Sequence, residues 1–367
     1  MGRLAGAPER PGGTLLTDGR ADDTEPSQGA PGRSRRSNTV RGVGLLIAVG
    51  VLVLAVLLSI AVGSTQIPLS TVLDVLAHRG NSNAAIVIWD LRLPRTVLGI
   101  AVGAALAVSG ALMQALTRNP LADPGLLGVN AGASAAVVIA IAFLGLSSLV
   151  SYVWFALIGA ALASGVVYLL GSRGRGGSSP VRLALAGTAI TAALTAFISA
   201  ITLTNTDVFD QYRFWSVGSL AGRDASVLTQ VAPFLVIGLV LALFLGGALN
   251  AIALGDETGR ALGAHLTRTR ILGACALTLL CGAATAAAGP IGFVGLTIPH
   301  VARAITGPDQ RWVLAYSAVL GPILMIGADT LGRIVVRPGE LEVGIITAIV
   351  GAPVFIALVR RRRIAAL

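Results

Sequence analysis

Long uncharged apolar runs follow one another along most of this 367-residue chain, and they constrain the fold more than any other feature of the sequence. The first run, VGLLIAVGVLVLAVLLSIAVG, covers 43–63 and is long enough to cross a bilayer, which takes about 20 residues of helix. Hydrophobic residues make up 54% of the chain and charged residues 12%, which is typical of a membrane protein. Because backbone N–H and C=O groups must be paired inside a bilayer, the runs predict an all-α bundle.

Charges, prolines and polar clusters divide the chain after residue 42 into ten expected transmembrane helices. The eighth is short and carries Pro299, His300 and Arg303, so we expect it to be buried among other helices instead of facing lipid. The ten spans are 43–63, 96–117, 126–147, 150–171, 181–204, 227–251, 271–289, 291–306, 312–332 and 343–359.

The two ends of the chain differ from the apolar region between them. Residues 1–42 are rich in Gly, Pro, Ser, Asp and Arg without apolar periodicity, which predicts a disordered cytoplasmic tail. This segment does not read as a secretory signal, because its apolar run starts too far from Met1. We therefore expect a transmembrane domain over 43–363 and a short C-terminal tail over 364–367.

The 27 basic residues are all arginines, since the sequence contains no lysine, and they give a net charge of +10. Most of them fall on the side of the predicted bundle that also holds the N-terminus, so the positive-inside rule predicts a multi-pass protein of the cytoplasmic membrane with both termini in the cytoplasm. The arginines are not interleaved with aromatic residues, which argues against nucleic-acid binding. The two cysteines and three histidines lack ligand spacing, so neither a metal site nor a cofactor is expected.

The sequence lacks the motifs that would make this chain an enzyme or a self-powered pump. A phosphate-binding P-loop requires a lysine, and neither a GxSxG elbow nor an HExxH helix is present. A gradient-driven transporter, the first alternative, would need carboxylates deep in the membrane, yet the only one in a predicted span is Asp329, four residues before Arg333. Transport energy is therefore expected from a partner; a passive scaffold or channel is the second alternative.

One polar segment, ALGDETGRALGAHLTRTR at 253–270, stands between two apolar runs on the predicted cytoplasmic side. Three glycines at every fourth position predict one smooth helical face, and acidic residues precede the arginines as a helix dipole favours. Asp256 and Arg260 have the spacing of a helical ion pair. From the residues alone, a helix that contacts a partner and a solvated loop are equally open. The candidate residues are Gly255, Asp256, Glu257, Thr258, Gly259, Arg260, Leu262 and Gly263.

Four long segments together resemble the FecCD permease family, the membrane subunits of type II ATP-binding-cassette (ABC) importers for iron(III)-siderophores, haem and cobalamin. The similarity runs from about residue 43 to the C-terminus in family order. The segments are LRLPRTVLGIAVGAALAVSGALMQALTRNPLADPGLLGVNAGA (91–133), IALGDETGRALG (252–263), GPIGFVGLTIPHVARAITG (289–307) and ADTLGRIVVRPGELEVGIITAIVGAPVFIALV (328–359).

The resemblance implies ten transmembrane helices in each of two permease subunits, which are identical or related, together with two cytoplasmic ATPase subunits and an extracytoplasmic substrate-binding protein. It implies that the segment containing GDETGRALG couples to the ATPase. It also implies a translocation path lined mainly by the fifth and tenth spans. An iron(III)-siderophore is the expected substrate, with cobalamin and haem as alternatives.

The resemblance further implies that Arg92 and Arg333 receive glutamates of the binding protein. The alternative from the residues is local pairing, of Arg92 with Asp90 and of Arg333 with Asp329. Because exposed ion pairs contribute little, reversing either arginine is expected to slow docking while stability changes little.

Overall fold

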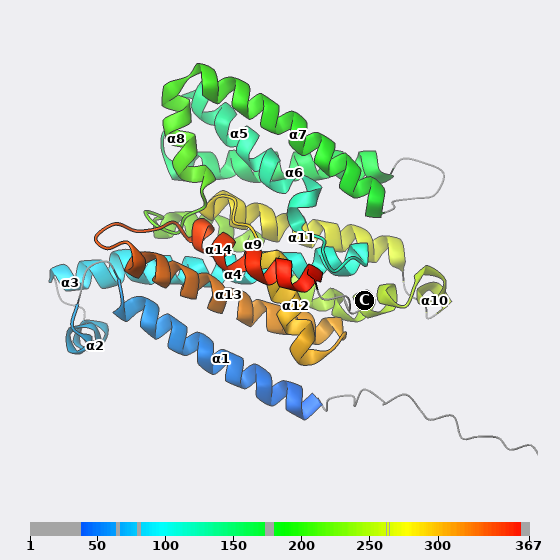
Figure 1. The fold of residues 1–367 in the computed structure, drawn as a ribbon, viewed down its shortest axis with the longest axis horizontal. Helices are drawn as coiled ribbons and strands as arrows, with labels where there is room; N and C mark the ends of the chain where they lie inside the picture. Colours follow the sequence, from blue (N-terminus) through cyan, green and yellow to red (C-terminus); the bar gives the residue numbers. More distant parts are fainter. Residues whose placement is uncertain are drawn as a thin grey trace, which may run out of the picture. The chain divides into compact units, whose positions relative to one another are not determined.

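The computed structural model describes residues 38–63, 67–78, 82–172, 180–261, 263 and 265–360. These residues form fourteen α-helices, one π-helical turn (η1) and one 3-10 turn (η2) (Figure 1). In chain order they are α1 (Asn38–Ala61), α2 (Leu69–Ala77), α3 (Asn83–Ile86), η1 (Val87–Arg92), α4 (Leu93–Thr117), η2 (Pro124–Leu127), α5 (Val129–Leu144), α6 (Leu149–Ser172), α7 (Pro180–Thr204), α8 (Thr206–Ser216), α9 (Ala225–Ala253), α10 (Asp256–Ala261), α11 (Leu266–Ala288), α12 (Val294–Thr306), α13 (Gln310–Val335) and α14 (Val343–Arg360).

The predicted all-α membrane fold is confirmed, and each of the ten predicted spans coincides with one helix. Within the described residues, seven helical segments are long and apolar enough to cross a membrane, and α5 and α14 are shorter apolar helices. The thirteen residues of α12 fall below that length, and its first half is buried, in agreement with the expectation for the eighth span. The count of ten is thus approximate as a count of full crossings.

The N-terminal boundary of the first helix differs from the predicted one. Helix α1 begins at Asn38, so 38–42 are helical and do not belong to the predicted tail. Residues 1–37 and the predicted C-terminal tail 364–367 lie outside the described part of the chain.

Helix α4 lies at the centre of the packing, between α13, α11, α12 and α9 (Figure 1). Most of its 25 residues are buried. Helices α5, α6, α7 and α8 pack against one another as a second group, which joins the first through contacts of α11 with α6 and α5. Helix α1 packs on α13 and leaves its large side chains Leu46 and Ile47 exposed, as suits a lipid-facing helix.

Small residues let α4 touch its neighbours at the backbone. A Cβ atom on Gly103 would lie 2.8 Å from backbone atoms of Gly321 and Pro322 in α13. About two helical turns further along α4, Gly110 lies against the backbone of Gly295 in α12 with no room for a side chain. Such contacts are the usual way in which helices associate tightly within a bilayer, where apolar burial gives little driving force.

The second span starts earlier than predicted. The prediction placed its start at residue 96, after Arg92, Pro94 and Arg95, but helix continues without a break from Asn83 through η1 into α4. Pro94 lies in the first turn of α4, just after the π-helical turn η1, and such a local irregularity is a usual accompaniment of a proline inside a continuous helix. Short α2 and α8 were not predicted, because their apolar residues are too few for a span.

Filling the α4–α13 contact should destabilise the protein. Gly103→Ala forces the two backbones apart, and we expect a loss of about 1–3 kcal/mol, the usual effect of overpacking. Gly50→Ala in α1, where a Cβ meets nothing within 4 Å, is the matched control and should be neutral. The measurement is the apparent melting temperature in detergent; equal melting temperatures for the two variants would contradict the close contact.

Candidate functional site

The first candidate site is a cluster of arginines at the C-terminal end of α1. Arg92 Nη1 donates to the carbonyl oxygens of Ile60 (2.7 Å) and Ala61 (3.0 Å). Arg333 Nη1 donates to the carbonyl oxygens of Ser59 (3.0 Å) and Val62 (3.1 Å). These are the carbonyls that a helix end leaves without intrahelical partners, so the two arginines cap α1.

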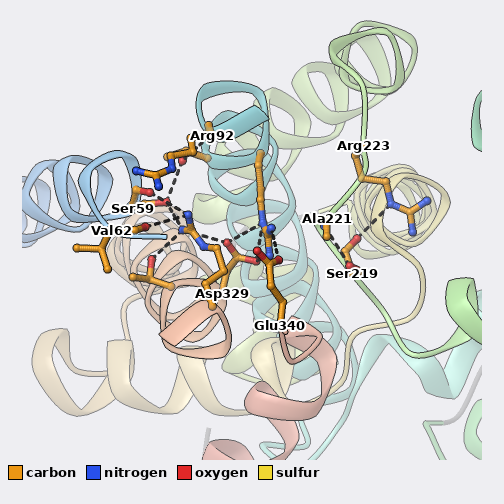
Figure 2. Close-up of polar contacts among 12 residues, drawn as sticks. Ser59, Val62, Arg92, Ser219, Ala221, Arg223, Asp329 and Glu340 are labelled. Atoms are coloured by element: carbon orange, nitrogen blue, oxygen red, sulfur yellow. Dashed lines mark hydrogen bonds and ion pairs between the residues drawn. The ribbon is translucent and has the colours of Figure 1, made fainter. Parts of the chain in front are cut away.

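The cluster continues through acidic residues. The guanidinium of Arg95 holds Asp329 at 2.8 Å and Glu340 at 2.7 Å, and Arg333 reaches the same Asp329 at 3.3 Å. Figure 2 shows Ser59, Val62, Asp329 and Glu340 gathered around these side chains, while Arg223 lies apart beside Ser219. The arrangement joins α1, α4, α13 and the turn before α14 into one polar network.

The two arginines named from the sequence therefore lie together, but both are buried, with 5% exposure for Arg92 and 2% for Arg333. The expected Arg333–Asp329 pair is present. This burial revises the expectation that replacing these arginines would leave stability unchanged, because a buried partner that loses its donor stays unsatisfied.

Sequence reasoning missed Arg95 and Glu340, which share this network, and Arg223. A cavity of about 310 Å³ opens beside the network, and Arg92, Arg95, Arg223, Arg333 and Glu340 are among its lining residues. Arg95 carried a signal, since it follows Arg92 by three residues and such spacing places two side chains on neighbouring positions of a helix. Glu340 and Arg223 stand in turns, where spacing gives no such signal.

The second candidate site is the segment 252–270, which contains α10. Asp256, the first residue of α10, accepts hydrogen bonds from Arg270 Nη2 on both carboxylate oxygens, each at 2.9 Å. Arg118, which ends α4 in the left-handed conformation, donates to the same carboxylate. Asp256 thus bridges α4, α10 and α11, and the helical pair with Arg260 suggested by spacing is replaced by partners from other helices.

The predicted glycine face is wrong as a continuous helical stripe. Helix α10 has six residues, and Gly255 and Gly263 lie outside it with φ of 102° and 79°, values that favour glycine. Gly259 is buried against its own chain, where a Cβ would come within 3.0 Å of the Ala251 carbonyl oxygen and 3.2 Å of Leu266. The glycines therefore shape the turns and seat α10 on α9 and α11.

The outward face of α10 is polar. Glu257, Thr258 and Arg260 are exposed, whereas Asp256 is turned toward its two arginines. Of the predicted coupling residues, Leu262 lies outside the described part of the chain. Glu257 and Asp256 are adjacent in sequence, yet one faces solvent and the other faces the protein.

The carboxyl group of Asp256 is ionised at physiological pH. Its partial burial raises the pKa, but hydrogen bonds from Arg270 and Arg118 and the attraction of their charges outweigh burial, so the pKa of Asp256 lies below its usual value. A depressed carboxyl pKa contributes stability that is present above the unfolded pKa and is lost only when the pH falls through the folded pKa. The bridge is consequently intact across the neutral range.

One helix connects the two candidate sites. Arg95 stands in the first turn of α4 and Arg118 directly follows its last residue, and the 25 residues between Leu93 and Thr117 span roughly 37 Å at about 1.5 Å each. A helix of this length can cross the bilayer core of about 30 Å, and the arginine cluster and α10 lie at its opposite ends. Figure 1 shows α10 and the turn containing α2 and α3 at opposite ends of this helix.

Comparison with known proteins decides the family. The model of the FecCD transport family matches residues 51–361. This chain belongs to the FecCD transport family. The ferric enterobactin transport system permease protein FepD of Escherichia coli is 48% identical over 320 residues, which cover 87% of this chain and 94% of FepD. The hemin transport system permease protein HmuU of Yersinia pestis is 38% identical, over 84% of this chain and 94% of HmuU.

A solved structure supports the same assignment. An inward-facing metal-chelate type ABC transporter matches with a TM-score of 0.76 and 27% identity, covering 88% of this chain and 99% of the matched chain. As a FecCD protein the chain is a membrane permease of the ABC transporter class. The FecCD family consists of transport permeases, which confirms the prediction that this polypeptide is not itself an enzyme.

Removing one arginine from the cluster should destabilise this FecCD permease. Arg333→Gln leaves the carbonyls of Ser59 and Val62 and one side of Asp329 without their donor, and we expect a loss of about 1–3 kcal/mol. Arg213→Gln in α8, whose side chain is 51% exposed, removes the same charge and is the control. Thermal unfolding in detergent checks this; if Arg333→Gln melts with the wild type, the cap contributes nothing.

Proposed function

We propose that this chain is the membrane-spanning subunit of an ABC importer that carries an iron(III)-siderophore complex and is powered by separate ATPase subunits. The observation that carries the proposal is the 48% identity to FepD across nearly the whole of both chains. The probable siderophore transport system permease protein YfiZ of Bacillus subtilis is 40% identical over 86% of this chain. Haem is the second candidate substrate, favoured by the 38% identity to HmuU, and cobalamin remains the third.

A gradient-driven mechanism finds little support in the structure. The one carboxylate in the predicted spans, Asp329, is 2% exposed and is held by Arg95 and Arg333. Both oxygens of this carboxylate already accept hydrogen bonds from Arg95, and Arg333 lies 3.3 Å away, so Asp329 is not an open site for a coupling ion. External ATP hydrolysis is the energy source that fits this arrangement.

We propose an orientation with both termini in the cytoplasm, following the bias of the arginines. In this orientation α10 meets the ATPase and the arginine cluster faces the binding protein. The residues offered to the ATPase are Glu257, Thr258 and Arg260, since they form the exposed face of α10. Gly255, Gly259 and Gly263 support that face from behind, and Asp256 anchors it.

Helices α7 and α14 are the proposed lining of the translocation path, together with their counterparts in a second permease subunit. Helix α7 leaves Thr188, Thr195 and Ser199 exposed alongside small alanines and some large apolar side chains, whereas α1 exposes mainly large aliphatic side chains. Hydroxyl groups are unfavourable against lipid and suit a subunit interface or a hydrated path. The rest of the membrane-facing surface contacts lipid.

Uptake of an iron-loaded siderophore should depend on ATP hydrolysis. In cells that contain this chain, its binding protein and its ATPase, replacing the P-loop lysine of the ATPase should abolish uptake of radioactive iron. Collapsing the proton gradient while ATP is maintained should leave uptake in place. Uptake that survives the dead ATPase and follows the gradient would show that the importer proposal is wrong.

The binding protein should dock through carboxylates that share Arg92 and Arg333 with the end of α1. Arg92 is buried but lines the cavity beside the network, where its charge attracts approaching carboxylates, so Arg92→Gln should lower the association rate at low salt by about tenfold and weaken its dependence on ionic strength. Exchanging the partner glutamate for Gln should have the same effect, and the double variant should show no further loss. The association rate is measured by stopped-flow in nanodiscs. Additive losses in the double variant would show that Arg92 and the partner glutamate do not contact each other.

A further inference from the structure

Asp256 makes the connection between α10 and the central helix. Its carboxylate holds Arg118 at the end of α4 and Arg270 in the first turns of α11 at the same time. Arg118 is 138 residues away in sequence, so this link is tertiary and does not follow from chain connectivity. We call Asp256 with Arg118 and Arg270 the Asp256 bridge.

Helix α10 has little to hold it in place besides this bridge and its packing on α9 and α11. Six residues are too few to form a stable helix alone, because helix nucleation is costly. Glycines with positive φ stand at both of its boundaries, at Gly255 and Gly263. A displacement of α10 can therefore be taken up by its two flanking turns unless a tertiary contact ties α10 to another helix.

Helix α4 is suited to receive such a displacement. It is buried along most of its length and contacts α13 and α12 at the backbone through Gly103 and Gly110, which leaves no soft layer between them. At its other end Arg95 holds Asp329 and Glu340. Arg118 and the arginine cluster thus stand at the two ends of one tightly packed helix, roughly 37 Å apart at about 1.5 Å per residue.

We propose that Asp256 is the positioning residue that transmits movement of α10 to α4, and that its neighbour Glu257 serves contact with the ATPase instead. This assignment rests on the proposed coupling of α10 to an ATPase. The two adjacent acidic residues receive different roles because their side chains point in different directions. Asp256 faces two arginines of its own chain, and Glu257 faces outward. The two should therefore fail differently when replaced.

The test uses the assembled transporter in proteoliposomes, with iron-siderophore uptake and ATP hydrolysis measured on the same sample. Asp256→Asn and Arg118→Gln should each lower the number of substrates carried per ATP by about fivefold or more, as expected for loss of coupling between sites. Hydrolysis and association with the ATPase should persist in both variants. Combining them should give no further loss, since both remove one contact.

Matched variants separate transmission from general structure. Arg270→Gln should lower transport per ATP, whereas Arg213→Gln, at an exposed arginine of α8 outside the segment 252–270, should leave that ratio at the wild-type value. Asp256→Glu keeps the charge and should retain most of the coupling. If Asp256→Asn fails to insert, Arg118→Gln and Asp256→Glu still decide the question through the same ratio.

Glu257→Arg distinguishes failure of this inference from failure of the proposed function. It should weaken association with the ATPase while the transporters that remain assembled keep their wild-type ratio. If Glu257→Arg and Asp256→Asn both leave association and the ratio unchanged, α10 is not a coupling element. If Glu257→Arg weakens association but Asp256→Asn and Arg118→Gln carry the wild-type number of substrates per ATP, the Asp256 bridge is only structural and the inference is overturned.

Discussion

Backbone contact between α4 and its neighbours sets the positions of the remaining helices. At Gly103 and Gly110 the chain of α4 lies directly against α13 and α12, and any side chain there would push these helices apart. Because apolar burial drives little association inside lipid, such close contact supplies much of the packing energy of a membrane bundle. It also makes α4 a stiff element, and both candidate sites stand at its ends.

The arginines at the end of α1 show how charge is used near a membrane surface. Arg92 and Arg333 satisfy four carbonyl oxygens that would otherwise lack partners, and Arg95 compensates Asp329 and Glu340. A guanidinium has five donors in a rigid plane, so one side chain can bind several carbonyls at once. The same cluster can therefore serve both the fold and a docking partner.

The sequence was sufficient to predict the order and approximate positions of the apolar helices, because apolar runs long enough to cross a bilayer allow few other structures. It failed where tertiary contacts decide. Spacing suggested a pair of Asp256 with Arg260, but Arg118 and Arg270 lie closer in space and take the carboxylate. Likewise, glycine spacing predicted a helical face at 255–263, but positive φ at Gly255 and Gly263 ends the helix between them. Neither contact leaves a periodic signal in the chain.

The cap on α1 has a consequence for biosynthesis. Arg92 follows its acceptor Ile60 by 32 residues, but Arg333 follows its acceptor Ser59 by 274, so the first helix leaves the ribosome long before its cap is complete. At about 5–20 residues per second the second interval lasts tens of seconds. During that time Arg92 can already bind its two carbonyl groups, whereas the carbonyl groups of Ser59 and Val62 have to rely on water or lipid headgroups for hydrogen bonds. The first helix to be inserted is consequently among the last to have its end fully capped.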